Sequence, residues 1–176
     1  MTFPTIWFTG LSASGKSTLS ESVYSKLISM GVKKIKLLDG EAIRDQIANQ
    51  LFDEKNREEI GQIKARIAKN FNNEGYIVLI SGIAHKSKWR SDIRKALDNY
   101  YEIFLNCSPE ICAKRDYKGH YERAISGELK NFIGVTEQYE FNDTADLVIN
   151  TSKYSIEECT DEIMKNILPL IKSNYK

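Results

Sequence analysis

The sequence has few cysteines, and it has no long apolar run. Three cysteines (Cys107, Cys112 and Cys159) are an odd number without metal-ligand spacing, which argues against a disulfide framework and against a structural metal site. The longest apolar run, Tyr76–Ile80, is far too short to span a bilayer. The first residues also lack the layout of a signal peptide. We therefore expect a cytoplasmic protein without a membrane partner.

The chain also lacks an excess of charge of one sign. Its 25 basic and 24 acidic residues give a net charge of +1, and the lysines are scattered. Surfaces that bind nucleic-acid polymers or membranes carry a positive field, so the balance excludes such partners. The chain has 176 residues, of which 41% are hydrophobic, and neither a repeat nor a linker divides it. This predicts a single globular domain over residues 1–176.

Short apolar runs alternate along the chain with stretches of helical period. The expected strands are Phe3–Thr9, Ile35–Leu38, Tyr76–Ile80, Tyr101–Asn106 and Leu147–Ile149. The expected helices are Lys16–Met30, Glu41–Gln50, Asn56–Glu74, Trp89–Leu97 and two that start at Ser108 and Ser155. This order predicts an α/β fold, in which a five-stranded, mainly parallel sheet is flanked by helices on both faces.

Two further features concern the edge of this sheet. Residues 116–142 are charged and interrupted by three glycines, so we interpret them as a mobile lid on the surface. Ligands of parallel sheets bind at the carboxyl ends of the strands. That rule places three segments at the same edge of the sheet: Gly10–Ser17, Asp39–Arg44 and Ser81–Arg90. It therefore predicts one ligand site built from all three segments.

A phosphate-binding loop is encoded between the first expected strand and the helix that follows. Residues Gly10–Ser17 match the pattern G-x4-G-K-[ST] at every defined position. Glycines let the backbone curl so that N–H groups face phosphate oxygens, and the helix start adds positive potential. Lys16 supplies charge toward the β- and γ-phosphates, and Ser17 can hold Mg2+. The predicted ATP-binding residues of this loop are Gly10, Ser12, Ala13, Ser14, Gly15, Lys16, Ser17 and Thr18.

GTPase switches use the same kind of loop and form a rival class. Asp116–Gly119 has the spacing D-x-x-G, but it does not follow an apolar strand. No N-K-x-D motif, which reads guanine, occurs in the chain. The sequence therefore favours an ATP-dependent kinase.

Segments beyond the loop resemble the adenylylsulfate (APS) kinase family. The family loop reads G-L-S-x-x-G-K-S-T, as Gly10–Thr18 does, and Leu37–Arg44 resembles its L-D-G-D-N-x-R segment. Arg115–Tyr121 and Gly127–Gly134 are similar to its R-D-x-K-G-x-Y and G-E-I-K-G-F-T-G segments. The resemblance spans nearly the whole chain. It implies a P-loop kinase fold, phosphorylation of the ribose 3′-hydroxyl of a small nucleotide by ATP, and pairing as a homodimer.

The resemblance also implies roles for single side chains around the donor. Asp39, at a strand end that faces the loop, can order Mg2+ or accept the hydroxyl proton, although its position also suits a helix cap. Lys16 and Asp39 are therefore the predicted catalytic residues, and Ser17 and Asp39 are the predicted metal ligands. Arg115 is expected to contact ATP.

On the acceptor side, Arg44 and Arg57 would hold phosphates by forked hydrogen bonds, or else be solvated helix arginines. Phe52 and Phe132 correspond to the pair that sandwiches the acceptor base, and each is equally compatible with a core position. Lid closure would bring lysines to the phosphates. The predicted acceptor-binding residues are Asp39, Glu41, Arg44, Phe52, Arg57, Ile83, His85, Lys86, Lys118, Lys130 and Phe132.

The sequence departs from the family pattern in ways that concern the acceptor. Glu41 replaces the usual Asp, and Ile60 replaces the usual Asn, which removes a polar contact. The family loop F-I-S-P-[YH]-R lines the phosphosulfate end of the acceptor, and its serine, proline and aromatic residue are here Ala84, His85 and Lys86. Such exchanges can shift specificity strongly, although His85 is also compatible with an ordinary exposed loop histidine.

The changed loop favours cytidine diphosphoramidate, the acceptor of relatives in bacterial capsule pathways, over APS. Both acceptors stay open, because an aromatic sandwich does not select the base. A kinase for another small metabolite and a non-catalytic nucleotide-binding module are the remaining alternatives. The presence of Lys16, Ser17 and Asp39 disfavours the latter.

Overall fold

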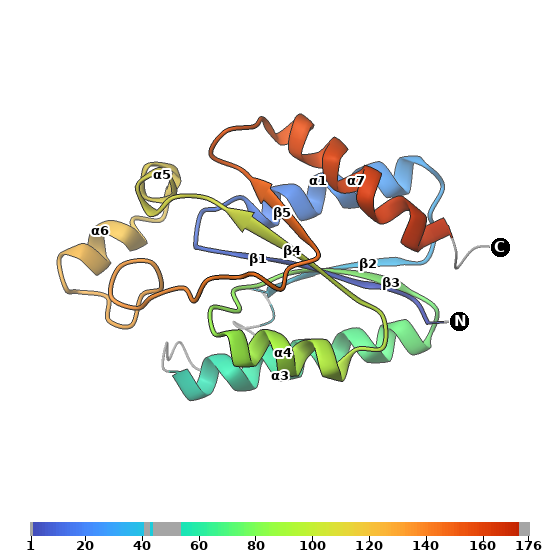
Figure 1. The fold of residues 1–176 in the computed structure, drawn as a ribbon, viewed down its shortest axis with the longest axis horizontal. Coiled ribbons are helices and arrows are strands. Elements are labelled where there is room, and N and C mark those ends of the chain that lie inside the picture. Colours follow the sequence, from blue (N-terminus) through green and yellow to red (C-terminus); the bar gives the residue numbers. More distant parts are fainter. Residues whose placement is uncertain (1, 41–42, 44–53, 173–176) are drawn as a thin grey trace.

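The computed structural model describes residues 2–40, 43 and 54–172. A central sheet lies between two layers of helices, with α1 and α7 on one face and α3 and α4 on the other (Figure 1). The strands are β1 (Thr5–Gly10), β2 (Ile35–Asp39), β3 (Ile77–Ser81), β4 (Tyr100–Asn106) and β5 (Leu147–Asn150). The helices are α1 (Lys16–Ser29), α3 (Glu54–Asn73), α4 (Ser87–Ala96), α5 (Pro109–Arg115), α6 (His120–Ile125) and α7 (Ile156–Lys172). Apart from Ile43, the helix expected at Glu41–Gln50 lies outside the described residues.

The strand order is β2-β3-β1-β4-β5, and all four pairings are parallel. Every residue of β1 and β3 is buried, since helices cover both faces of these strands. The predicted five-stranded α/β fold is therefore confirmed. Among the described residues, none of the helices combines the length and apolar character needed to cross a membrane.

Alternate residues of the central strand supply two separate cores. Side chains along a strand point to opposite faces in turn. Ile6 and Phe8 of β1 pack into the core that includes residues of α1 and α7, whereas Trp7 packs with Ala68 of α3 and Ile93 of α4. This two-sided burial holds the strand ends, and the loops that follow them, in fixed positions.

Two helix starts predicted from capping residues are confirmed. The Ser108 hydroxyl accepts a hydrogen bond from the Ile111 amide at 3.4 Å, with proline next in the chain. Ser155 and Glu158 form a reciprocal capping box. The Glu158 amide donates to Ser155 Oγ at 3.2 Å, and the Ser155 amide donates to Glu158 Oε2 at 2.8 Å.

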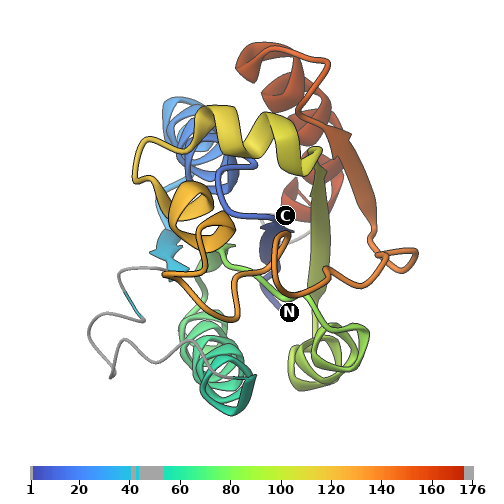
Figure 2. The ribbon, with the colours of Figure 1, turned by 90° about the vertical axis from the view of Figure 1, so that its left-hand side faces the viewer.

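Residues 116–142 run across the carboxyl ends of the strands, where α6 and the loop after it lie beside the loop that follows β1 (Figure 2). The expectation that this segment lies on the surface holds only in part, because some of its apolar residues belong to a third core cluster. Tyr121, Phe132 and Ile133 are buried there against Leu11 of the phosphate loop. The mobility of this segment stays a prediction. From here on we call residues 116–142 the lid segment.

Candidate active site

The loop after β1 takes a backbone path that its small residues permit. Gly10, Ala13 and Gly15 have φ values of 149°, 58° and 98°. A Cβ atom placed at Gly10 would lie 2.7 Å from the Leu105 carbonyl oxygen, so a larger residue there would collide with β4. The resulting turn delivers the chain directly into α1, which starts at Lys16.

Hydrogen bonds from distant segments brace this loop. Tyr121 in the lid segment donates from its hydroxyl to the Ser12 carbonyl at 3.0 Å. Thr151, after β5, donates to the Ser14 carbonyl at 2.9 Å. The loop is therefore held by contacts from two other parts of the chain, and it does not depend on its own turn alone.

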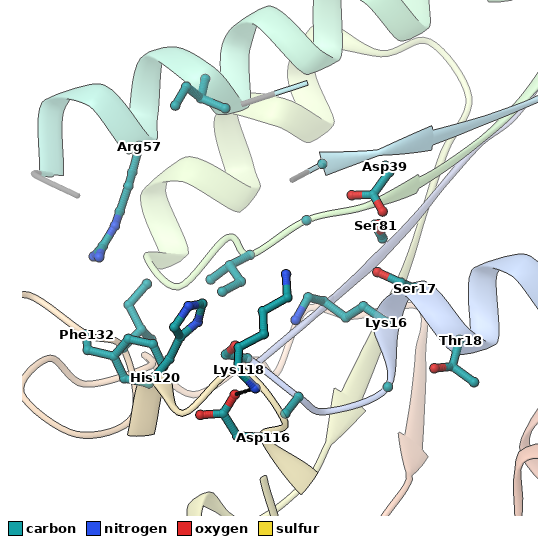
Figure 3. Close-up of a pocket in the computed structure, with 18 of the residues that line it drawn as sticks. Lys16, Ser17, Thr18, Asp39, Arg57, Ser81, Asp116, Lys118, His120 and Phe132 are labelled. Carbon is teal, nitrogen blue, oxygen red and sulfur yellow. Dashed lines mark hydrogen bonds between the residues drawn. The ribbon is translucent and has the colours of Figure 1, made fainter. Parts of the chain in front are cut away.

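A cavity of about 340 Å³ opens beside the loop, between the strand ends, α3 and the lid segment (Figure 3). Its lining includes these residues predicted from the sequence: Ser12, Ala13, Gly15, Lys16, Ser17, Thr18, Asp39, Arg57, Ile83, Lys118 and Phe132. The size suits a small ligand and is within the usual range for such sites. The structure thus brings together predicted donor-side and acceptor-side residues in one space.

The donor end of the cavity gathers the predicted catalytic groups. Asp39 ends β2 and is paired in register with Ser81 of β3. Figure 3 shows the Asp39 carboxylate close to Ser81 and the Ser17 hydroxyl, with the Lys16 side chain extending into the cavity. The Lys16 ammonium donates to the Leu11 carbonyl at 2.6 Å. A carboxylate, a hydroxyl and an ammonium are therefore grouped beside the phosphate loop.

The other end of the cavity is formed by α3 and the lid segment. Phe132 is 6% exposed and packs edge-on against Tyr121, with ring centroids 4.9 Å apart. It therefore belongs to the third cluster, which confirms the core interpretation, and it also lines the cavity. Its contact with an acceptor base stays a prediction. Ile60 of α3 lines the cavity as well, so an apolar surface stands at that position.

Glu137 of the lid segment lies between Arg57 and His85, two of the predicted acceptor-binding residues. Its carboxylate accepts a hydrogen bond from the Arg57 guanidinium at 3.1 Å and lies 3.4 Å from His85 Nε2. Arg57 also donates to the Asn131 carbonyl. Arg57 is therefore not a solvated helix arginine, because it ties α3 to the lid segment at the cavity edge.

Other predicted residues lie elsewhere. Gly10 and Ser14 lie outside the cavity lining, and the Ser14 side chain is fully buried. Arg115 donates to the Thr151 carbonyl at 2.7 Å and is not part of the cavity lining. Lys86 pairs with Glu140 at 3.8 Å. The predicted residues outside the lining are Gly10, Ser14, Arg115, His85, Lys86 and Lys130, and Glu41, Arg44 and Phe52 lie outside the described residues.

The idea that His85 is an exposed loop histidine is wrong. Its side chain is 0% exposed and sits edge-on to Trp89, with ring centroids 4.7 Å apart. Burial, followed by the charge of Arg57, lowers the pKa of His85 to about 4. The imidazole is thus a neutral packing residue behind the cavity at neutral pH.

The buried position of His85 predicts acid sensitivity. Between about pH 6.5 and pH 4 the unfolded chain binds a proton at His85 that the folded chain does not, so stability falls as the pH falls. Because of this residue, the free energy of unfolding should fall by up to about 1.4 kcal/mol for each pH unit in that window. Urea unfolding at pH 7 and pH 4.5 should show that acid lowers the free energy of unfolding less in His85→Gln than in the wild type. His120→Gln, which keeps His85, should retain the steeper loss, and equal losses in all three proteins would contradict the assignment.

Several residues that shape the site were not predicted. Lys64 of α3 is 7% exposed and lines the cavity. Arg90 of α4 is 1% exposed and donates to the carbonyls of Ala84 and Phe141 at 3.0 and 2.9 Å. It thereby fixes the loop after β3 to the end of the lid segment. Neither residue carries a local sequence signal, since isolated basic residues on helices are usually exposed.

Comparison with known proteins places this geometry in a family. The family model described as adenylylsulphate kinase matches residues 3–150. The chain belongs to the adenylylsulphate kinase family. An adenylyl-sulfate kinase of Synechococcus sp. (strain JA-3-3Ab) is 34% identical over 93% of both chains. A cytidine diphosphoramidate kinase of Campylobacter jejuni is also 34% identical, over 92% of this chain and 95% of that protein.

A solved structure agrees with this assignment. The Mycobacterium tuberculosis APS kinase in complex with AMPPNP and APS superposes with a TM-score of 0.87 at 30% identity, over 93% of this chain and 96% of that chain. As a member of the adenylylsulphate kinase family, the protein is an ATP-dependent phosphotransferase that acts on a hydroxyl group. The predicted P-loop kinase fold is confirmed.

Proposed function

We propose that the protein transfers the γ-phosphoryl group of ATP to the ribose 3′-hydroxyl of a small nucleotide. The observation that carries the proposal is a single cavity that has the phosphate loop at one end and Arg57 with Phe132 at the other. Asp39 lines the same cavity. This arrangement supports a donor phosphate at Lys16 and an acceptor against α3 and the lid segment.

The residues present supply the chemistry of such a transfer. Lys16 and the loop would bind the donor phosphates and offset charge in the transition state. Asp39 would accept the proton of the attacking hydroxyl or hold the metal ion. Ser17 and Asp39 are oxygen donors that fit Mg2+, a cation that uses few protein ligands when substrate phosphates supply the others. When bound, Mg2+ would neutralise charge on the donor phosphates.

The choice between two acceptors is open to experiment. Cytidine diphosphoramidate was favoured by the loop with His85 and Lys86, and the 34% identical Campylobacter jejuni relative supports it. However, His85 and Lys86 do not line the cavity. The exchanges at these two positions therefore do not favour one acceptor over the other. The Synechococcus relative and the neighbour bound to APS support APS to the same degree.

The deciding experiment is an acceptor comparison. The protein is incubated with Mg-ATP and either APS or cytidine diphosphoramidate, and the products are separated and their phosphorylated position is determined. We expect a 3′-phosphorylated product from at least one acceptor, with kcat/KM at least tenfold higher for the physiological one. ADP formation that depends on neither nucleotide would contradict the proposal. A cytoplasmic location and a homodimer stay predictions.

A further inference from the structure

His120 is a polar side chain of the cavity to which the proposed transfer gives no role. It is the first residue of α6, and it lines the cavity together with Lys118 and Phe132. The family segment R-D-x-K-G-x-Y, to which Arg115–Tyr121 is similar, leaves the position of His120 undefined. A cavity position that the family pattern leaves open suits a role in the choice of substrate better than a role in the shared chemistry.

His120 belongs to a group of three rings at the lid end of the cavity. Phe132 packs edge-on against Tyr121, and the centroid of His120 lies 6.3 Å from that of Phe132, with 67° between the two ring planes. The Tyr121 hydroxyl donates to the Ser12 carbonyl, and Tyr121 is not part of the cavity lining. The two rings that a ligand would meet are therefore Phe132 and His120.

The imidazole nitrogens of His120 are available to a ligand. Among the described residues, none forms a hydrogen bond or an ion pair with this side chain, whose ring contact is with Phe132. Figure 3 shows the ring beside Phe132, on the side of the cavity that the lid segment forms. A neutral imidazole offers one N–H donor and one acceptor nitrogen. His120 can therefore form a hydrogen bond with a ligand without giving up one with the protein.

The neighbouring side chains indicate which part of a nucleotide the imidazole would meet. Phosphate groups have cationic partners elsewhere in the lining, with Lys16 at the phosphate loop and Arg57 on α3. The aromatic ring of Phe132 suits a planar base, because bases stack on such rings. A base stacked on Phe132 would have an edge beside His120. That edge carries the donors and acceptors that distinguish one base from another.

We propose that His120 is a specificity-determining residue, whose imidazole forms a hydrogen bond with the edge of the acceptor's base and thereby selects the nucleotide that is phosphorylated. This inference rests on the proposed function. Stacking on Phe132 tolerates any base, because every base has an aromatic face. The hydrogen bond to His120 supplies the selection that stacking lacks. The substrate class is a nucleoside 5′-phosphate derivative with one preferred base.

The test uses four acceptors that differ only in the base: adenine, cytosine, guanine or uracil. All four carry the terminal group, phosphosulfate or diphosphoramidate, that the acceptor comparison selects. The kcat and KM values are measured at saturating ATP for the wild type, His120→Leu, His120→Asn and the control Glu122→Leu. Glu122 is exposed on the same helix and lies outside the cavity lining.

We expect the wild type to prefer one base, and His120→Leu to reduce that preference roughly tenfold, which is the effect of one hydrogen bond. The preference is the ratio of kcat/KM for the best base to that for the next. The loss should lie in the KM of the preferred acceptor, with its kcat and the KM of ATP changed less than threefold. His120→Asn keeps a donor and an acceptor, so it should restore part of the preference. Glu122→Leu should keep the wild-type ratio.

The ratio separates base selection from a structural role. A structural role of His120 in the lid segment would lower kcat/KM equally for all four acceptors and leave the ratio unchanged, and this result would overturn the inference. A wild type that uses all four bases equally well would overturn it too.

A failure of the proposed function would be recognised separately. If the wild type phosphorylates no acceptor with either terminal group, AMP, CMP, GMP and UMP are titrated by calorimetry into protein already saturated with AMPPNP. A preference for one base that falls at least fivefold in His120→Leu supports base selection even though the proposed reaction has failed. Equal preferences in the wild type and the variant, or no binding of any of the four, overturn the inference.

Discussion

Replacing Lys16 by alanine is expected to lower kcat by roughly two to three orders of magnitude or more, while the fold is retained. The Lys16 ammonium extends into the cavity from the first residue of α1, and it would follow the charge on the phosphoryl group during transfer. Alanine keeps the helix, so only the charge and its reach are lost. The measurement is ADP release at saturating ATP and acceptor, beside circular dichroism and thermal unfolding.

Lys26→Ala is the matched control for this variant. Lys26 lies on the same helix, where it pairs with Asp161 on the surface. Its removal should change kcat by less than twofold, since exposed ion pairs contribute little. Turnover by Lys16→Ala within tenfold of the wild type would remove the phosphate loop from the mechanism.

Replacing Asp39 by asparagine is expected to lower kcat by roughly two or more orders of magnitude. The amide has nearly the same shape, so the pairing of residue 39 with Ser81 at the strand ends should persist. The carboxylate is lost, and with it the proton acceptor or metal ligand that the proposal places there. Steady-state kinetics should show the loss in kcat, with the KM of ATP changed much less.

Asp98→Asn serves as the control for the loss of a carboxylate, because Asp98 is exposed and pairs with Lys69 outside the cavity. It should retain wild-type kinetics. If Asp39→Asn were as active as Asp98→Asn, Asp39 would have only the role of a structural residue at the start of the next segment. That outcome would keep the phosphate loop in the mechanism, but Asp39 would be neither the proton acceptor nor a metal ligand.

The strands and the phosphate loop could be predicted from sequence because their signals are local. An unbroken apolar run such as Ile77–Ile80 indicates a strand that is buried on both faces, and this signal lies within the run itself. The spacing of Gly10, Gly15 and Lys16 likewise encodes a backbone path within eight residues. Predictions of this kind hold because few competing structures suit the same pattern.

The remaining parts of the site depend on partners far apart in sequence. Arg90 approaches Glu102, with Nε 3.9 Å from Oε1, and both side chains are buried. Lys64 and His85 are buried in the same way. Charged and polar residues are usually exposed, so their burial beside a cavity cannot be predicted from the local sequence. The buried part of the lid segment is hard to predict for a related reason, because Phe132 and Ile133 lie in a polar stretch of the sequence but pack into an apolar cluster in space.

The contacts made by the carbonyl groups of the phosphate loop have a consequence for its electrostatics. Within a peptide unit, the C=O and N–H bonds point in opposite directions. Tyr121 and Thr151 hold the carbonyls of Ser12 and Ser14, and this fixes the orientation of the amide dipoles that follow them. An arriving anion would therefore meet dipoles already aligned, and little of its binding free energy would be spent on reorienting them.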